Sequence, residues 1–100
     1  MVNVFKALGD STRREILKLL NEGDMTAGEI SGKFNMTKPA ITKHLEILRN
    51  AELVSSRKAG VNVIYSINLT VLQEALGGFL DYFEKREPQN VPGGRAEYEA

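Results

Sequence analysis

The sequence predicts a mainly α-helical fold of about five helices with one two-stranded β-hairpin. Two capped helical segments follow each other within residues 26–50, and a β-hairpin pattern begins directly after them, at Leu53. Two helices joined by a tight turn form a helix-turn-helix, and a hairpin placed after them forms a wing. The predicted fold class is therefore a winged helix-turn-helix.

Two further helices are expected before this unit. Apolar residues at helical spacing indicate a short helix over residues 2–8. The segment 9–12 interrupts that pattern and supplies an N-cap for a second helix, which stops at the polar segment 21–24. These helices would supply the apolar surface on which the helix-turn-helix packs.

The helix-turn-helix is indicated by two sets of capping residues. Thr26 and Glu29 have the spacing of a capping box, which opens a short helix ending at about Phe34. Thr37 can cap the next helix. Pro39 is tolerated in its first turn, because the backbone N–H groups there have no intrahelical partner.

The rest of the predicted fold is a hairpin and a last helix. Residues 53–58 and 63–67 have strand character and flank a turn at 59–62, which is rich in residues that adopt positive φ. The segment Thr70–Gln73 has the pattern of a capping box and predicts a helix to about Arg86. These two elements complete the expected domain.

The length of 100 residues allows one small domain and excludes two. We expect that domain over residues 1–87 and a flexible tail over 88–100, because the chain is polar after Pro88. No segment resembles a signal peptide or the run of roughly 20 apolar residues that spans a bilayer. The sequence therefore predicts a cytoplasmic protein without membrane insertion.

The composition argues against most kinds of active-site chemistry. The chain has no cysteine, which excludes disulfides, thiolate metal ligands and cysteine nucleophiles. Its one histidine, His44, is too few for an ordinary zinc site or catalytic triad. We therefore expect neither an enzyme nor a cofactor or metal site.

Positive charge is concentrated in one segment of a chain whose formal net charge is zero. Residues 38–58 contain five basic side chains and two acidic ones, namely Lys38, Lys43, Arg49, Arg57 and Lys58 against Glu46 and Glu52. A local basic patch on a neutral chain is typical of a nucleic-acid interface. Double-stranded DNA is therefore the expected partner.

The predicted helix over 38–50 has an apolar arc that packs inward and a polar arc that faces outward. Lys43 and Thr42 lie on the polar arc, where they are placed to contact base edges in the major groove. Lys38 and the free N–H groups near Thr37 suit a phosphate. The alternative is an ordinary solvated face, and the basic hairpin that follows favours DNA.

His44 has two interpretations that the residues alone leave open. Its helical angle lies inside the apolar arc, which favours a half-buried ring bonded to the backbone. A phosphate or base contact is the alternative.

Arg57 and Lys58 lie beside the predicted turn of the hairpin, where the wing of such domains meets phosphates or the minor groove. The alternative is two solvated charges on an exposed edge. Val61 at the tip cannot contact phosphate through its side chain, which indicates a shallow wing contact.

The first and last predicted helices carry more apolar residues than a lone surface helix needs. We expect these residues to form a dimer interface with a second copy of the chain, and packing on their own domain is the alternative. A two-fold dimer would place two such helix-turn-helix units about one DNA turn apart, on a palindromic site. The expected interface residues are Val4, Phe5, Leu8, Leu72, Leu76, Phe79, Leu80 and Phe83.

Four segments carry a resemblance to a known family, and together they are specific: Phe5–Leu17, Met25–Ile30, Lys38–Leu45 and Tyr65–Ile67. Over residues 2–83 the chain resembles the ArsR-type winged-helix transcriptional repressors, and within them the metal-independent branch. The resemblance implies a homodimer that represses by occupying its operator. It also implies base contacts from Lys38, Pro39, Thr42, Lys43 and His44.

The chain departs from the pattern of many relatives at two places. It has neither the cysteine pairs nor the Asp/His/Glu sets with which relatives sense metals, so metal sensing is not expected. It also has Val61 where a basic residue is common at the wing tip. The protein or ligand that lifts repression stays open, and a winged-helix module for protein–protein contact is the alternative function.

Overall fold

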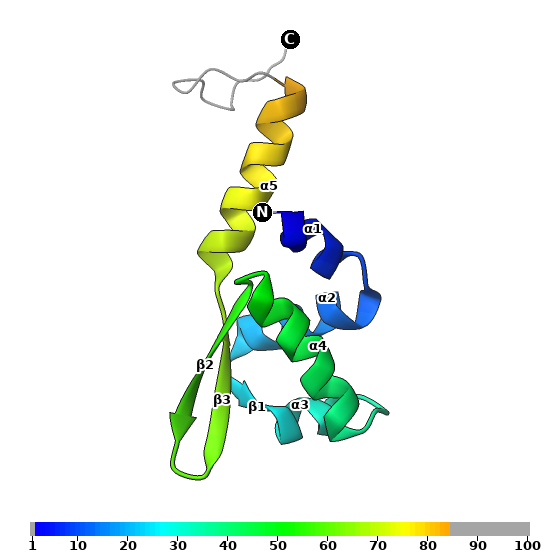
Figure 1. Cartoon of the computed structure of the whole chain (residues 1–100), viewed down its shortest axis with the longest axis vertical. Helices are drawn as coiled ribbons and strands as arrows, with labels where there is room; N and C mark the ends of the chain where they lie inside the picture. The colour runs from blue at the N-terminus through cyan, green and yellow to red at the C-terminus, as the bar shows by residue number, and fades with distance from the viewer. Residues whose placement is uncertain (1, 85–100) are drawn as a thin grey trace.

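The computed structural model describes residues 2–84, with side chains from Asn3 onward. Five helices and three strands lie in this part of the chain. Their bounds are α1 Val2–Leu8, α2 Ser11–Glu22, β1 Met25–Thr26, α3 Ala27–Lys33, α4 Lys38–Asn50, β2 Val54–Ala59, β3 Asn62–Ile67 and α5 Leu69–Glu84. The winged helix-turn-helix and its five helices are confirmed (Figure 1).

One apolar core joins the helices to the base of the wing. Ile16 of α2, Ile30 of α3 and Leu45 of α4 are completely buried, and Leu53 and Val54 bring the start of β2 into the same cluster. Burying side chains of this size contributes about 1.5–3 kcal/mol each. The core therefore fixes α4 on its inner face and leaves its outer face to solvent.

The expected caps form at the starts of α3 and α4. Thr26 accepts from the Glu29 N–H at 3.1 Å, and the Glu29 carboxylate accepts from the Thr26 N–H at 2.9 Å, which completes the capping box. Thr37 accepts from the Ala40 N–H at 3.3 Å. Ser31 closes the turn between the two helices by donating to the Met36 carbonyl at 2.9 Å.

The C-terminal end of α4 carries the one non-glycine residue with positive φ in the described part, Glu52 at 62°. The N–H of Glu52 donates to the Arg49 carbonyl, and the N–H of Leu53 donates to the Leu48 carbonyl at 3.0 Å. This is a Schellman motif, which usually has glycine at the left-handed position. Glu52 therefore holds a conformation that costs an L-residue about 1–2 kcal/mol.

The two-stranded wing is confirmed as the antiparallel hairpin of β2 and β3, and a third, short strand that was not expected, β1, extends the sheet. The strand order is β1-β3-β2, and both pairs are antiparallel. The short β1 pairs Met25 with Tyr65 and Thr26 with Ile64. This pairing joins the wing to the residues that begin α3.

The last helix, α5, leaves the body of the domain and passes beside α1 (Figure 1). It begins at Leu69, and the Asn68 carbonyl accepts from the N–H groups of Val71 and Leu72. Thr70 therefore lies in the first turn and does not cap the helix as expected. No helix in the described part is long and apolar enough to cross a bilayer. The predicted tail over 88–100 lies outside the described residues.

Candidate nucleic-acid interface

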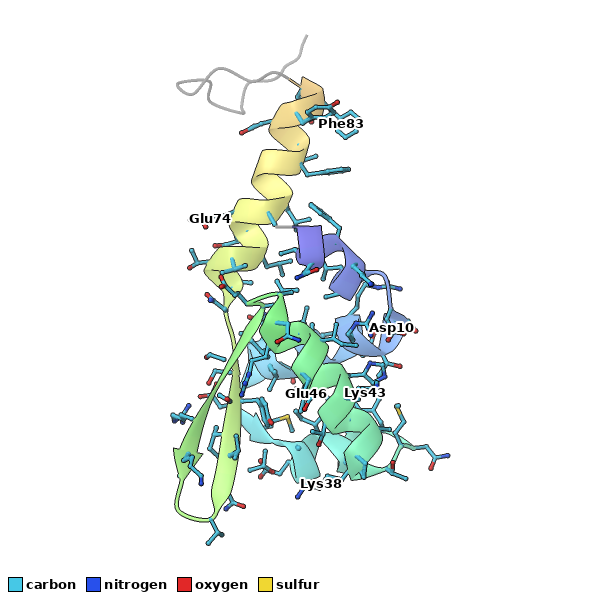
Figure 2. The ribbon with its side chains drawn as sticks, in the orientation of Figure 1. Asp10, Lys38, Lys43, Glu46, Glu74 and Phe83 are labelled. Carbon is cyan, nitrogen blue, oxygen red and sulfur yellow. The ribbon has the colours of Figure 1, made fainter. Side chains whose placement is uncertain are left out.

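The outer side of α4 presents two free lysines, as the helical pattern predicted. Lys38 and Lys43 are exposed, and neither forms a side-chain hydrogen bond or ion pair within residues 2–84. Thr42, on the turn between them, is half-buried. Figure 2 shows Lys38 at the end of α4 and Lys43 further along the same helix. We call Lys38, Thr42 and Lys43 the reading face.

Lys38 and Thr42 of the reading face border a hollow of about 260 Å³ that lies between α4 and the wing. The hollow is lined by Thr26, Ala27, Gly28, Lys38, Thr42, Val61, Asn62, Val63 and Tyr65. Hydroxyl, amide and ammonium groups therefore converge on a concave surface between two protruding elements. Such a surface can receive the sugar-phosphate backbone of a duplex while α4 enters its major groove.

The other two residues expected at the start of α4 are exposed there. The Thr37 hydroxyl oxygen is engaged as the N-cap, so a ligand would be met by its O–H hydrogen or by the backbone N–H of Lys38, since Pro39 has no N–H and the Ala40 N–H donates to Thr37. Pro39 takes its place in that first turn and offers an apolar surface.

The wing separates its two basic residues onto opposite faces. Arg57 donates to the Asp24 carboxylate at 3.1 Å and to the Ser66 hydroxyl at 3.2 Å, so its charge is already paired within the protomer. Lys58 is exposed and has no ion pair within the described part of the chain. Strand alternation puts Lys58 on the same face as Ser56, which accepts from Arg49 of α4. Lys58 therefore faces the α4 side, and Arg57 does not.

The wing tip is formed by Gly60, at a φ of 67°, and Val61. The Val61 side chain is 98% exposed. Its aliphatic side chain offers no hydrogen-bonding group, which leaves the backbone as the polar surface of the tip.

His44 is half-buried, and its partner is a side chain and not the backbone. The ring Nδ1 lies 3.3 Å from Arg13 Nη1 of α2 and 3.9 Å from Asp10 Oδ2. Arg13 also donates to the carbonyl oxygens of Ala7 at 2.7 Å and Lys6 at 3.3 Å, at the end of α1. Nothing in helical spacing predicted this link, because the two residues are 31 positions apart.

Asp10, which Figure 2 labels, completes the cluster around His44. Its carboxylate is the N-cap of α2 and accepts from the Arg13 N–H at 3.1 Å. That hydrogen bond holds the pKa of the Asp10 carboxyl below its usual value, and the nearby Arg13 guanidinium acts in the same direction. The carboxylate therefore stays charged beside α4.

A second surface, far from the reading face, is apolar. Leu76, Phe79, Leu80 and Phe83 of α5 are between 43% and 66% exposed. The Phe79 ring packs against the Phe5 ring of α1, with centroids 5.2 Å apart and planes inclined by 45°. We call these five residues the apolar stripe.

The other residues expected at a dimer interface lie deeper. Val4 is only 2% exposed and belongs to the protomer's own core, so it presents no surface to a partner. Leu8 and Leu72 are partly buried against that core. They also line an apolar hollow of about 380 Å³ between α1, α2 and α5, which is continuous with Leu76 of the stripe.

Among residues 2–84 no three His, Cys, Asp or Glu side chains are grouped closely enough to hold a metal ion.

The reading face, the hollow and the wing are the features of a DNA-binding regulator of transcription with a winged helix-turn-helix. Residues 10–56 match the family model described as "Bacterial regulatory protein, arsR family". The chain is 51% identical over 85 residues to the transcriptional repressor SdpR of Bacillus subtilis (strain 168), covering 85% of this chain and 94% of that protein. It therefore belongs to the ArsR family.

Solved structures support the same assignment. An ArsR-like transcriptional regulator from Rhodococcus sp. RHA1 is similar with a TM-score of 0.79 and 31% identity, over 84% of this chain and 77% of that one. The homodimeric winged helix-turn-helix DNA-binding domain of a possible ArsR-family regulator from Mycobacterium bovis has a TM-score of 0.69 and 26% identity, over 89% and 86% of the two chains. The family and fold expected from the sequence are thus confirmed.

Proposed function

We propose that the protein is a homodimeric repressor that occupies a palindromic operator. In this proposal α4 contacts the bases and the wing contacts the sugar-phosphate backbone of the DNA. The observation that carries the proposal is that three lysines, Lys38 and Lys43 of α4 and Lys58 of the wing, are exposed and form no ion pair within the described part of the chain. Lysines that form no internal ion pair are available to replace the counterions of DNA phosphates.

The roles follow from position. Lys43 and Thr42 lie on the exposed side of α4, where Lys43 would donate to guanine O6 or N7 and Thr42 to a base edge. Lys38 borders the hollow beside the wing and would bind a phosphate through its ammonium group and its backbone N–H at the start of α4. Pro39 would pack against the backbone of the duplex.

The apolar stripe supports the homodimer. A second copy placed on α1 and α5 would cover Phe79 and Phe83 and leave both reading faces exposed. Two-fold symmetry would set the two copies of α4 about one helical turn of DNA apart, roughly 34–36 Å, which matches a palindrome with two half-sites. The domain over residues 1–87 would suffice for both tasks, in the cytoplasm and without catalytic chemistry.

The test begins with fragments that the purified protein selects from its own genomic DNA. Affinity for the selected site and for a scrambled site is then measured by fluorescence anisotropy at several salt concentrations. Lys43→Ala should weaken specific binding about tenfold or more and leave scrambled-site binding nearly unchanged, because base contacts carry about 1–3 kcal/mol of discrimination. Absence of any enriched fragment would contradict the proposal.

Lys18→Ala is the matched control for Lys43→Ala. Lys18 is an exposed lysine of α2 that lines the hollow beside α5, away from the reading face. The control should bind the selected site as the unaltered protein does. Equal losses for the two variants would mean that net charge, and not the reading face, governs binding.

The wing offers a second matched pair. Lys58→Ala should lower the slope of log affinity against log salt by about two for a dimer, since each phosphate contact contributes nearly one. Arg57→Ala should change that slope less, because Arg57 is already paired with Asp24. The reverse order would move the wing contact to the other face of the hairpin.

A further inference from the structure

The contact between Arg13 and His44 determines which atom of the imidazole ring carries a proton. A guanidinium group has donors and no acceptor, so the Nδ1 atom that lies 3.3 Å from Arg13 Nη1 must accept. A neutral ring that accepts at Nδ1 carries its proton on Nε2. A proton on Nδ1 would instead point at the positive guanidinium.

The other atoms of the cluster hold this arrangement in place. Arg13 is anchored by Nε to the Ala7 carbonyl at 2.7 Å and by Nη2 to the Lys6 carbonyl at 3.3 Å, so its third nitrogen is directed at the ring. Asp10 Oδ2 lies 3.9 Å from Nδ1, which is too long for a hydrogen bond. The guanidinium is therefore the hydrogen-bonding partner of Nδ1.

The Nε2–H that results has no hydrogen-bond partner within residues 2–84. It belongs to a side chain that is 19% exposed and that follows Lys43 directly in α4. Polar groups that are neither buried nor paired are the ones that a ligand can use. A neutral Nε2–H donates to the same base and phosphate acceptors that the reading face addresses.

We propose that Arg13 is a positioning residue for DNA recognition: it holds the His44 ring with Nδ1 as acceptor, so that Nε2–H is presented as a hydrogen-bond donor to DNA. The inference rests on the proposed function, because it adds one donor to the same interface. It assigns to α2 a part in recognition that acts through the His44 ring.

The link has a second consequence, since Arg13 also holds the end of α1. Phe5 of α1 contributes to the apolar stripe through its contact with Phe79. The chain of contacts therefore runs from the stripe through α1 and Arg13 to α4.

The direct test uses nitrogen NMR of the ring, which is unambiguous because His44 is the sole histidine of the chain. At a pH where the ring is neutral, the unaltered protein should show a protonated Nε2 and an unprotonated Nδ1. Arg13→Met should yield a mixture of the two tautomers. Retention of the pure Nε2–H form in Arg13→Met would overturn the proposal.

Arg14→Met is the matched control for the structural role of Arg13. Arg14 Nη1 donates to the Leu8 carbonyl at 2.7 Å, so it also caps the end of α1, but it does not contact His44. Arg14→Met should leave the tautomer of His44 and the affinity for specific DNA unchanged. Equal effects of the two variants would mean that Arg13 only caps the end of α1 and does not position His44.

A double-mutant cycle measures the DNA contact. His44→Phe, which keeps a ring and removes both nitrogens, should lower the ratio of specific to non-specific binding roughly tenfold. Arg13→Met should cause a similar loss alone and little further loss in the His44→Phe background. Full additivity of the two substitutions would contradict the proposal. The NMR measurement uses no DNA, so its result does not depend on the proposed function. A failure of the proposed function would be seen in the DNA-binding measurements alone.

Discussion

The helices α4 and α5 are similar in length, but the protomer covers much of the apolar surface of α4 and little of the apolar surface of α5. Three apolar residues of α4 are completely buried, namely Ile41, Leu45 and Leu48. The single fully buried residue of α5 in the described part is Ala75, whereas Leu76, Phe79, Leu80 and Phe83 of the same helix remain exposed. The apolar side of α4 is covered within one chain, whereas α5 has an exposed apolar surface that a second chain could cover.

This difference separates the two tasks of the molecule. A helix whose inner face is fully packed holds its outer side chains in defined directions, which base recognition requires. A helix with a large exposed apolar face is typical of an interface between subunits. We therefore expect substitutions on α4 to impair folding or DNA binding and substitutions on the exposed face of α5 to impair dimer formation.

The largest effect is expected from Leu45→Ala in α4. The residue is completely buried, and a truncation of this kind costs about 2–5 kcal/mol through lost burial and the cavity left behind. Chemical denaturation at a fixed protein concentration would report the loss in free energy of unfolding. A loss below about 1 kcal/mol would mean that α4 is not held by the core as described.

The next effect is expected from Leu80→Glu on the apolar stripe. The side chain is 45% exposed, so the protomer loses little packing, but a carboxylate would be desolvated without a partner in the dimer. The dissociation constant of the dimer should rise at least about a hundredfold, as sedimentation analysis would measure. Thr70→Glu adds the same charge on an exposed, polar part of α5 and should leave the dimer intact. A Leu80→Glu protein that remains dimeric would move the interface elsewhere.

A smaller effect, and one of opposite sign, is expected at the end of α4. Glu52→Gly relieves the positive φ of 62° and should raise the free energy of unfolding by about 0.5–1 kcal/mol, after allowance for the greater freedom of glycine in the unfolded chain. Asn50→Gly, inside the same helix, should lower it. Thermal unfolding of both variants at equal concentration would give the two signs. A destabilised Glu52→Gly protein would indicate that the carboxylate has a structural contact of its own.

Local patterns accounted for much of the fold. The capping box of Thr26 and Glu29 and the N-cap at Thr37 depend on spacings of three residues, which the sequence displays directly. The strand β1 escaped prediction because two residues are too few to show alternation, and its partner Tyr65 lies far along the chain. Thr70 was wrongly predicted to be the N-cap of the last helix, because the residue pattern of a capping box also occurs by chance inside the first turn of a helix.

The candidate site divides in the same way. Helical angles identified Lys38 and Lys43 as outward residues, and the structure leaves both unpaired within the described part of the chain. Long-range pairs were invisible to such reasoning: Arg57 meets Asp24 across 33 positions, and Arg13 meets His44 across 31. Val4 was assigned to a dimer interface because periodicity marks an apolar face without saying whether its own domain or a partner covers it.

The pairing of β1 with β3 has a consequence for how such a regulator can diverge. The strand joins the wing to the start of α3, so the elements beside the hollow share one framework. Helix α5 follows this framework after Asn68 and does not line the hollow. After a gene duplication, substitutions on α5 could alter the spacing between half-sites or the choice of subunit partner without changing the bases that are read. Substitutions on the reading face could do the reverse. The two properties can therefore evolve independently in one short gene.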